Sequence, residues 1–184
     1  MKATGIVRRI DDLGRVVIPK EIRKTLRIRE GDPLEIFTDK EGEIILKKYS
    51  PIGELGEFAE KYAESLHKTS GYITCITDKD SVVAISGASK RDFSDKTLSP
   101  TLEKVIADKA TIIVRSPDEE TIPIVADENN ETRYTSQIVA PIISEGDPIG
   151  AVIMLSTEPG TKMGEAEEKL AKSAAGFLGS HMEQ

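Results

Sequence analysis

The chain has 184 residues, and its 25 Lys or Arg against 32 Asp or Glu give a formal net charge of −7 at pH 7. The single cysteine excludes a disulfide framework within one chain and leaves no cysteine cluster for zinc. No apolar run approaches the ~20 residues of a membrane span, and the start lacks the apolar core of a signal peptide. We therefore expect a cytoplasmic protein of one or two domains without a membrane partner.

The charge is divided unevenly along the chain. Residues 1–50 hold 12 Lys or Arg and 9 Asp or Glu, a net of +3, so the remaining residues carry −10. A basic part attracts nucleic acid and an acidic part repels it. The asymmetry therefore indicates two segments with different partners.

The basic part predicts the element order ββαββ. We expect strands over 4–10 and 15–18, a short helix over 19–26, and strands over 34–38 and 43–49. Residues 11–14 have the composition of a turn, and Pro19 opens the helix, where its missing N–H costs nothing. Fifty residues with one short helix bury too little surface to be stable alone, so we expect an obligate dimer.

Cationic side chains gather in this part. Seven lie within twenty positions: Arg8, Arg9, Arg15, Lys20, Arg23, Lys24 and Arg27. At about 100° per residue, the apolar Ile22 and Leu26 share one face of the helix, and the cations fan across the other. Phosphates attract such a cluster, and arginine forks can read guanine edges, so the pattern indicates double-stranded DNA as the partner.

Three motifs of this part resemble the AbrB family of bacterial transition-state regulators. They are Thr4-Gly5-Ile6-Val7-Arg8-Arg9, Leu13-Gly14-Arg15-Val16-Val17-Ile18-Pro19 and Ile44-Ile45-Leu46-Lys47-Lys48-Tyr49. The resemblance implies a β-dominated swapped-hairpin domain over 1–50, in which the hairpins of two chains interleave into one barrel. It also implies DNA binding by Arg8, Arg15 and Arg23, with Arg9 and Lys24 as basic neighbours. Lys24 stands where arginine is common in the family, and it keeps the charge but loses the fork.

A linker over 51–55 is expected to precede a second domain over 56–184. The patterns predict helices over 52–66, from Pro100 onward and over 164–182, and strands over 72–77, 81–86, 110–114, 134–143 and 148–156. This order is typical of an α+β domain built around an antiparallel sheet.

Two stretches of the second domain resemble the end of a GAF domain, the small-molecule sensor fold. They are Ile138-Val139-Ala140-Pro141-Ile142-Ile143 and Gly146-Asp147-Pro148-Ile149-Gly150-Ala151-Val152. With its AbrB-like part, the chain resembles regulators of sporulation genes, which implies a transcription activator and repressor in the forespore. We expect a small pocket under the loops 87–99 and 115–131, with no tightly retained cofactor. The small-molecule ligand and the residues that bind it stay unidentified.

The sequence predicts no catalytic residue and no metal site. His67 and His181 each stand alone on a helical pattern, and Cys75 is expected as a small buried hydrophobe within a strand. Some GAF-like enzymes reduce methionine sulfoxide with cooperating cysteines, so we expect no enzyme here. The alternative function is an antitoxin-like protein-interaction module, because some antitoxins share the swapped-hairpin fold. The regular apolar pattern of the second half disfavours it, since antitoxins usually carry a disordered acidic tail.

The two long helices of the second domain suggest a second interface. In GAF domains the helices corresponding to 52–66 and 164–182 lie side by side. The small residues Ala171, Ala174, Ala175 and Gly176 are expected on an exposed face, where they permit close helix approach. If the short linker prevents both interfaces from joining the same two chains, the product is a homotetramer that binds two DNA segments at once.

Overall fold

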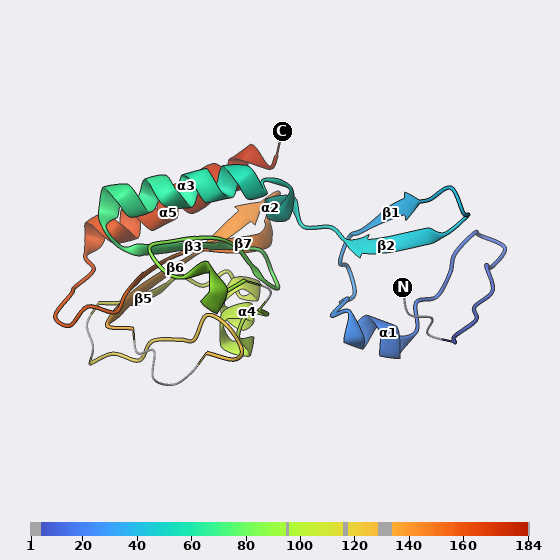
Figure 1. The fold of residues 1–184 in the computed structure, drawn as a ribbon, viewed down its shortest axis with the longest axis horizontal. Helices are drawn as coiled ribbons and strands as arrows, with labels where there is room; N and C mark the ends of the chain where they lie inside the picture. The colour runs from blue at the N-terminus through green and yellow to red at the C-terminus, as the bar shows by residue number, and fades with distance from the viewer. Residues whose placement is uncertain (1–4, 95, 116–117, 129–133, 184) are drawn as a thin grey trace. The chain divides into compact units, whose positions relative to one another are not determined.

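The computed structural model describes residues 5–94, 96–115, 118–128 and 134–183. The chain divides into two compact units, residues 1–49 and residues 50–184 (Figure 1). Among the described residues, no helix is long and apolar enough to cross a membrane.

The first unit contains one short helix and one regular hairpin. Its elements are α1 (Lys20–Thr25), β1 (Leu34–Thr38) and β2 (Ile44–Lys48). The two strands pair antiparallel, with Leu34 opposite Lys48. Asp39 closes their turn by accepting the backbone N–H groups of Glu41 and Glu43. The hairpin and the helix expected from the sequence are confirmed.

The two strands expected at the start are not regular strands in the single chain. Residue 4 lies outside the described residues, and residues 5–10 and 15–18 have no ladder of strand hydrogen bonds. A strand needs a partner strand, and the described part of this chain offers these segments none. Their apolar side chains are left in water, with Val7 85% and Val17 71% exposed. Among residues 5–49 only Pro19 is buried.

The segment 51–55, expected as a linker, contains the short helix α2 (Pro51–Glu54). Ser50 caps this helix by accepting the N–H of Gly53, and Pro51 occupies the first turn, where a missing N–H costs nothing. Ile52 is fully buried in the core of the second unit. The structure therefore differs from the expected linker, because residues 50–54 fold as part of the second unit.

The second unit is a five-stranded antiparallel sheet with helices on both faces (Figure 1). Its further elements are α3 (Gly56–Ser70), β3 (Ile73–Thr77), β4 (Val82–Ser86), η1 (Lys90–Asp92), α4 (Pro100–Ala107), β5 (Ile112–Val114), β6 (Ser136–Ser144), β7 (Asp147–Ser156) and α5 (Glu165–His181). The strand order is β4-β3-β7-β6-β5. Helices α3 and α5 cover one face, and α4 covers the other. The predicted α+β domain is confirmed.

Alternation along the central strands divides the core into two layers. On β7, Val152 and Met154 belong to the cluster under α3 and α5, whereas Ile153 and Leu155 belong to the cluster under α4. All four are fully buried. A strand buried on both faces must be apolar on both faces, which is why this stretch reads as a continuous apolar run.

The small residues of α5 lie on the opposite side from the one expected. Ala171, Ala174 and Ala175 are buried against the sheet. The expectation that they form an exposed face is wrong, because they pack with Leu178 in the core between α5 and the sheet. Only Gly176 of the expected set is exposed, and its neighbour Phe177 is the large residue that faces solvent.

Candidate nucleic-acid interface

The turn over residues 11–15 is the best-defined part of the candidate interface. Asp11 accepts the backbone N–H groups of Leu13 and Arg15 with Oδ1, at 3.0 and 2.7 Å. Its carbonyl accepts the N–H of Gly14 at 3.0 Å, and its own N–H donates to the carbonyl of Arg15. Gly14 has a φ of +75°, a conformation that glycine adopts without steric cost. These bonds bring the two arms of the turn together.

Arg15 is held by the same carboxylate. Its Nε donates to Asp11 Oδ2 at 2.8 Å, and most of the Arg15 side chain faces solvent. The backbone and side-chain hydrogen bonds from Arg15 lower the pKa of Asp11, so this carboxylate stays ionised at neutral pH. The turn therefore presents an exposed guanidinium in a defined orientation.

Helix α1 carries two further candidates. Pro19 precedes the helix, and its carbonyl accepts the N–H of Arg23 at 3.0 Å. Arg23 and Lys24 lie exposed in the last turn, where cations also interact favourably with the negative end of the helix dipole. Their charge is thus available to a phosphate without an energetic conflict inside the helix.

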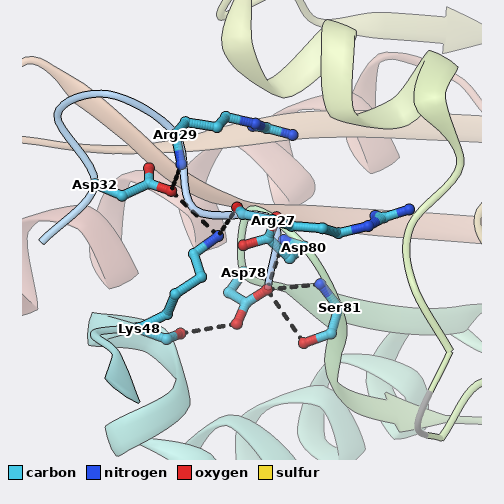
Figure 2. A network of polar contacts seen from close by, with 8 residues as sticks. Arg27, Arg29, Asp32, Lys48, Asp78, Asp80 and Ser81 are labelled. Atoms are coloured by element: carbon cyan, nitrogen blue, oxygen red, sulfur yellow. Dashed lines mark hydrogen bonds and ion pairs between the residues drawn. The ribbon is translucent and has the colours of Figure 1, made fainter. Parts of the chain in front are cut away.

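Lys48 is a cation with a structural task, as Figure 2 shows. Its Nζ donates to the carbonyl of Arg27 at 3.1 Å and pairs with Asp32 at 3.3 Å. Asp32 also accepts the backbone N–H of Arg29. Arg27 has a φ of +54°, so the bond from Lys48 supports a residue in the left-handed region. Lys48 therefore ties the end of β2 to the segment after α1.

The five predicted DNA-binding residues are all exposed, on three short segments of the first unit. They are Arg8 and Arg9 before the turn, Arg15 after it, and Arg23 and Lys24 on α1. Among the described residues, Arg8 makes one long local contact, from Nη1 to the carbonyl of Val7 at 3.4 Å. In the same described part of the chain, no hydrogen bond or ion pair joins any two of these five side chains. Sequence reasoning missed the role of Asp11, although an aspartate opening a turn four residues before an arginine is the signal for this contact.

The second unit has a polar latch on the α4 side of its sheet. Gln137 of β6 bonds both backbone groups of Ile122 at 2.9 Å, and Ser99 donates to the carbonyl of Pro123. Glu128 accepts hydrogen bonds from the backbone of Ile124 and from the hydroxyl of Tyr134. Burial and the bond to Glu128 raise the pKa of Tyr134. These contacts hold residues 122–128, part of the loop expected over a pocket, against the sheet.

The other residues weighed for a chemical role are Cys75, His67 and His181, and each has contacts typical of a structural residue. Cys75 is fully buried, as expected, and desolvation raises the pKa of its thiol. His67 Nδ1 lies 2.7 Å from the carbonyl of Tyr72, and His181 stacks on Phe58. Among the described residues, no group of three or more His, Cys, Asp or Glu is placed to hold a metal ion.

Comparison with known proteins decides the family. Residues 54–183 match the model described as "Stage V sporulation protein T C-terminal, transcription factor". The full chain is 52% identical to stage V sporulation protein T of Bacillus subtilis, with 100% of both chains covered. The chain belongs to the stage V sporulation protein T family. Its two-unit architecture is therefore that of a sporulation transcription factor family.

The first unit has additional relatives outside the stage V sporulation protein T family. Over 51 residues the chain is 67% identical to the transition state regulatory protein AbrB of Bacillus subtilis, covering 28% of this chain and 52% of AbrB. Residues 7–54 also match the model described as "Antidote-toxin recognition MazE, bacterial antitoxin". The resemblance of the first unit to AbrB is confirmed.

Solved structures establish the fold of the second unit. A GAF domain region from Geobacter sulfurreducens aligns with a TM-score of 0.56 at 18% identity, over 71% of this chain and 93% of that chain. A free methionine-R-sulfoxide reductase from Thermoplasma acidophilum aligns with a TM-score of 0.52 at 15% identity, over 70% and 94%. At identities this low, the likeness shows that the second unit has a GAF-like fold. Nothing about the activity of this chain follows from it.

Proposed function

We propose that this protein is a DNA-binding regulator of sporulation genes, which activates some and represses others through a dimer of its first unit. The observation that carries the proposal is the set of exposed cations around the turn 11–15 and on α1, in a stretch 67% identical to AbrB. The five cations attract phosphates, and the oriented fork of Arg15 suits a guanine edge.

The exposed apolar residues of the first unit support dimerisation. Large apolar side chains from both arms of the turn and from the hairpin face solvent in the single chain; they include Val7, Ile10, Val17, Ile36 and Ile44. Interleaving with a second chain would give the segments 5–10 and 15–18 strand partners and bury these side chains. It would also double the cationic surface, giving ten candidate contacts per dimer.

Replacement of Arg15 tests the DNA-binding assignment. In Arg15→Ala we expect specific DNA binding to be lost while the dimer persists, because a guanidinium contact to a base is worth ~1–3 kcal/mol and a dimer loses two. A mobility-shift assay measures the affinity, and light scattering measures the mass. Lys40→Ala, which removes the same charge from the exposed turn between β1 and β2, is the matched control. Unchanged operator affinity in Arg15→Ala would refute the assignment.

The second unit, residues 50–184, is proposed as a sensor and assembly domain, joined to a DNA-binding domain formed by the first unit, residues 1–49. Its GAF-like fold supports the proposal of a small-molecule ligand, bound under the loops 87–99 and 115–131. A thermal-shift screen of the full chain against metabolite pools tests this role. Stabilisation by a compound identifies the ligand, and the absence of any shift across the screen contradicts the proposal.

The second unit also supports a homotetramer, in which α3 and α5 of two chains form a helical bundle. Two DNA-binding dimers bridged in this way would gain affinity by effective concentration when two operator segments are close. The cytoplasm of the developing forespore is the proposed location, in keeping with the family. No enzymatic activity is proposed.

The antitoxin-like module is the second candidate, and the match of residues 7–54 to the MazE model favours it. Against it stands the second unit, which folds around its own sheet and has no resemblance to an extended acidic tail. The strength of DNA binding as a function of salt distinguishes the two. A protein whose function is to hold a toxin would show a flat salt dependence toward DNA.

A further inference from the structure

The carboxylate of Asp11 has two tasks in the turn before Arg15. Oδ1 accepts the backbone N–H groups of Leu13 and Arg15 at 3.0 and 2.7 Å, and Oδ2 accepts the Arg15 Nε–H at 2.8 Å. One side chain therefore fixes both where the backbone of Arg15 lies and how its guanidinium is directed.

We propose that Asp11 is a positioning residue for Arg15 that sets the sequence preference of the protein, an inference that rests on the DNA-binding function proposed above. An arginine can approach guanine side-on, through Nε and one Nη, or end-on, through both Nη groups. Because Asp11 occupies Nε, only the end-on approach remains, and the two Nη groups stay available for O6 and N7.

The contact also prepares Arg15 for binding. An arginine side chain has many rotamers, and part of this freedom is lost when the guanidinium binds a base edge. Asp11 restricts the guanidinium before DNA arrives, so less freedom is lost on binding. The contact is local, since every hydrogen bond of the turn joins residues within 11–15. It therefore does not depend on a second chain.

The charge of Asp11 acts on non-specific binding in the opposite direction. The pKa of Asp11 is lowered by the hydrogen bonds from Arg15, so a negative charge lies within a surface that meets phosphates. This charge weakens binding to any duplex, whereas the orientation of Arg15 strengthens binding only where the right base is present. Specificity is the ratio of the affinities for the right and the wrong duplex. The charge of Asp11 lowers both affinities alike, so the orientation of Arg15 is what raises the ratio.

The test compares Asp11→Asn with Asp12→Asn in the full chain. Asparagine keeps an oxygen for the two backbone N–H groups but loses the charge-assisted bond to Nε. Asp12 is the matched control, because it is the next residue, is exposed, and has no hydrogen bond or ion pair among the described residues. Fluorescence anisotropy gives the affinity for a duplex selected by the wild-type protein from a random library, and for a scrambled duplex of equal length.

We expect Asp12→Asn to raise both affinities by one factor and leave their ratio unchanged. Asp11→Asn should raise the affinity for the scrambled duplex similarly, but lower the ratio of selected to scrambled affinity by about two- to fivefold for each Arg15 contact, the range of an exposed charged contact. In an Arg15→Ala background, Asp11→Asn should leave the ratio unchanged, because the residue it positions is gone.

Equal increases in both affinities for Asp11→Asn, as for Asp12→Asn, would overturn the proposal. Circular dichroism checks that Asp11→Asn folds. Asp11→Ser is a second variant, whose hydroxyl also accepts N–H groups of the turn, and its ratio of selected to scrambled affinity is measured in the same way. Failure of the proposed function looks different. In that case the wild-type protein selects no duplex, or Arg15→Ala binds the selected duplex as tightly as the wild type.

Discussion

Phe177 of α5 lies against Tyr62 of α3, with ring centroids 5.5 Å apart, and 49% of Phe177 faces solvent. Phe58 stacks on Tyr62 at 5.8 Å and on His181 at 5.4 Å. Four aromatic rings from two helices thus form one group at the outer side of the helical layer. An aromatic ring half in water above a packed group is typical of an interface residue.

We predict that Phe177→Glu converts a tetramer into dimers. The side chain is half exposed, so glutamate is tolerated in the folded unit, but it places a charge where two chains would meet. Sedimentation or light scattering at micromolar concentration measures the mass. The dimers should still bind DNA, but more weakly, because each lacks the second DNA-binding dimer of the tetramer. If the wild-type mass equals two chains and does not rise with concentration, the tetramer is refuted.

Ala174→Glu is the informative comparison on the same helix. Ala174 is buried against the sheet, so a carboxylate there is placed in the core and not at the outer face. We expect it to destabilise the whole second unit, with a lower melting temperature, instead of splitting a folded tetramer. A folded Ala174→Glu variant with the mass of a dimer would show that the interface between chains does not lie at the exposed face around Phe177.

A second prediction uses two glycines of α5. A Cβ at Gly179 would lie 2.0 Å from the carbonyl oxygen of Ile143, whereas a Cβ at Gly176 meets nothing within 4 Å. Gly179→Ala should therefore lower the unfolding free energy by about 1–3 kcal/mol. Gly176→Ala should raise it by about 0.5–1 kcal/mol through helix propensity. Denaturant unfolding measures both, and light scattering checks that their assembly states agree. Equal effects would contradict the close packing of α5 on β6.

The third prediction concerns salt. Each phosphate neutralised contributes about 0.9 to the slope of log K against log salt, so ten candidate cations per dimer should give a slope of magnitude at least about 5. Anisotropy titrations between low and physiological salt measure it. Removing Arg23 should reduce the magnitude by about 2 per dimer if both copies contact phosphate. A flat dependence would support the antitoxin-like alternative.

The fourth prediction concerns alkaline pH. Burial, and then the bond to Glu128, raise the pKa of Tyr134 above its ordinary value of 10.0. Its contribution to stability is therefore complete below pH 10 and is lost as the pH rises toward the folded pKa. Tyr134→Phe should flatten this loss by about 1.4 kcal/mol per pH unit while costing about 1–2 kcal/mol at neutral pH. Urea unfolding at several pH values measures both.

The periodic segments of the second unit were predictable because local pattern and tertiary packing agree there. The run 148–156 is apolar on both faces, and the structure buries both faces of β7. The exposed side of α5 was not predictable, since alanine is compatible with a core and with a close helix interface alike. The packing of α5 on the sheet, with its close approach of Gly179 to Ile143, decides which side faces the sheet.

The first unit shows the opposite case. The segments 5–10 and 15–18 have the composition of strands but no partner strand in the described part of the single chain. The sequence pattern and the observed structure therefore disagree there. The cations of the candidate interface were found from charge density and motif, which need no coordinates. The contact between Asp11 and Arg15 was not, because turn composition indicates where the chain reverses and not which side chain the aspartate will hold.

The shortage of buried residues in the first unit has a consequence for dosage. A segment in which only Pro19 is buried among residues 5–49 gains its core by pairing, so its folding is governed by mass action between chains. At low expression the amount of folded DNA-binding unit then rises with the square of chain concentration. A twofold change in synthesis would become nearly a fourfold change in functional regulator, so the onset of control over a target gene would be steeper than the accumulation of the protein itself.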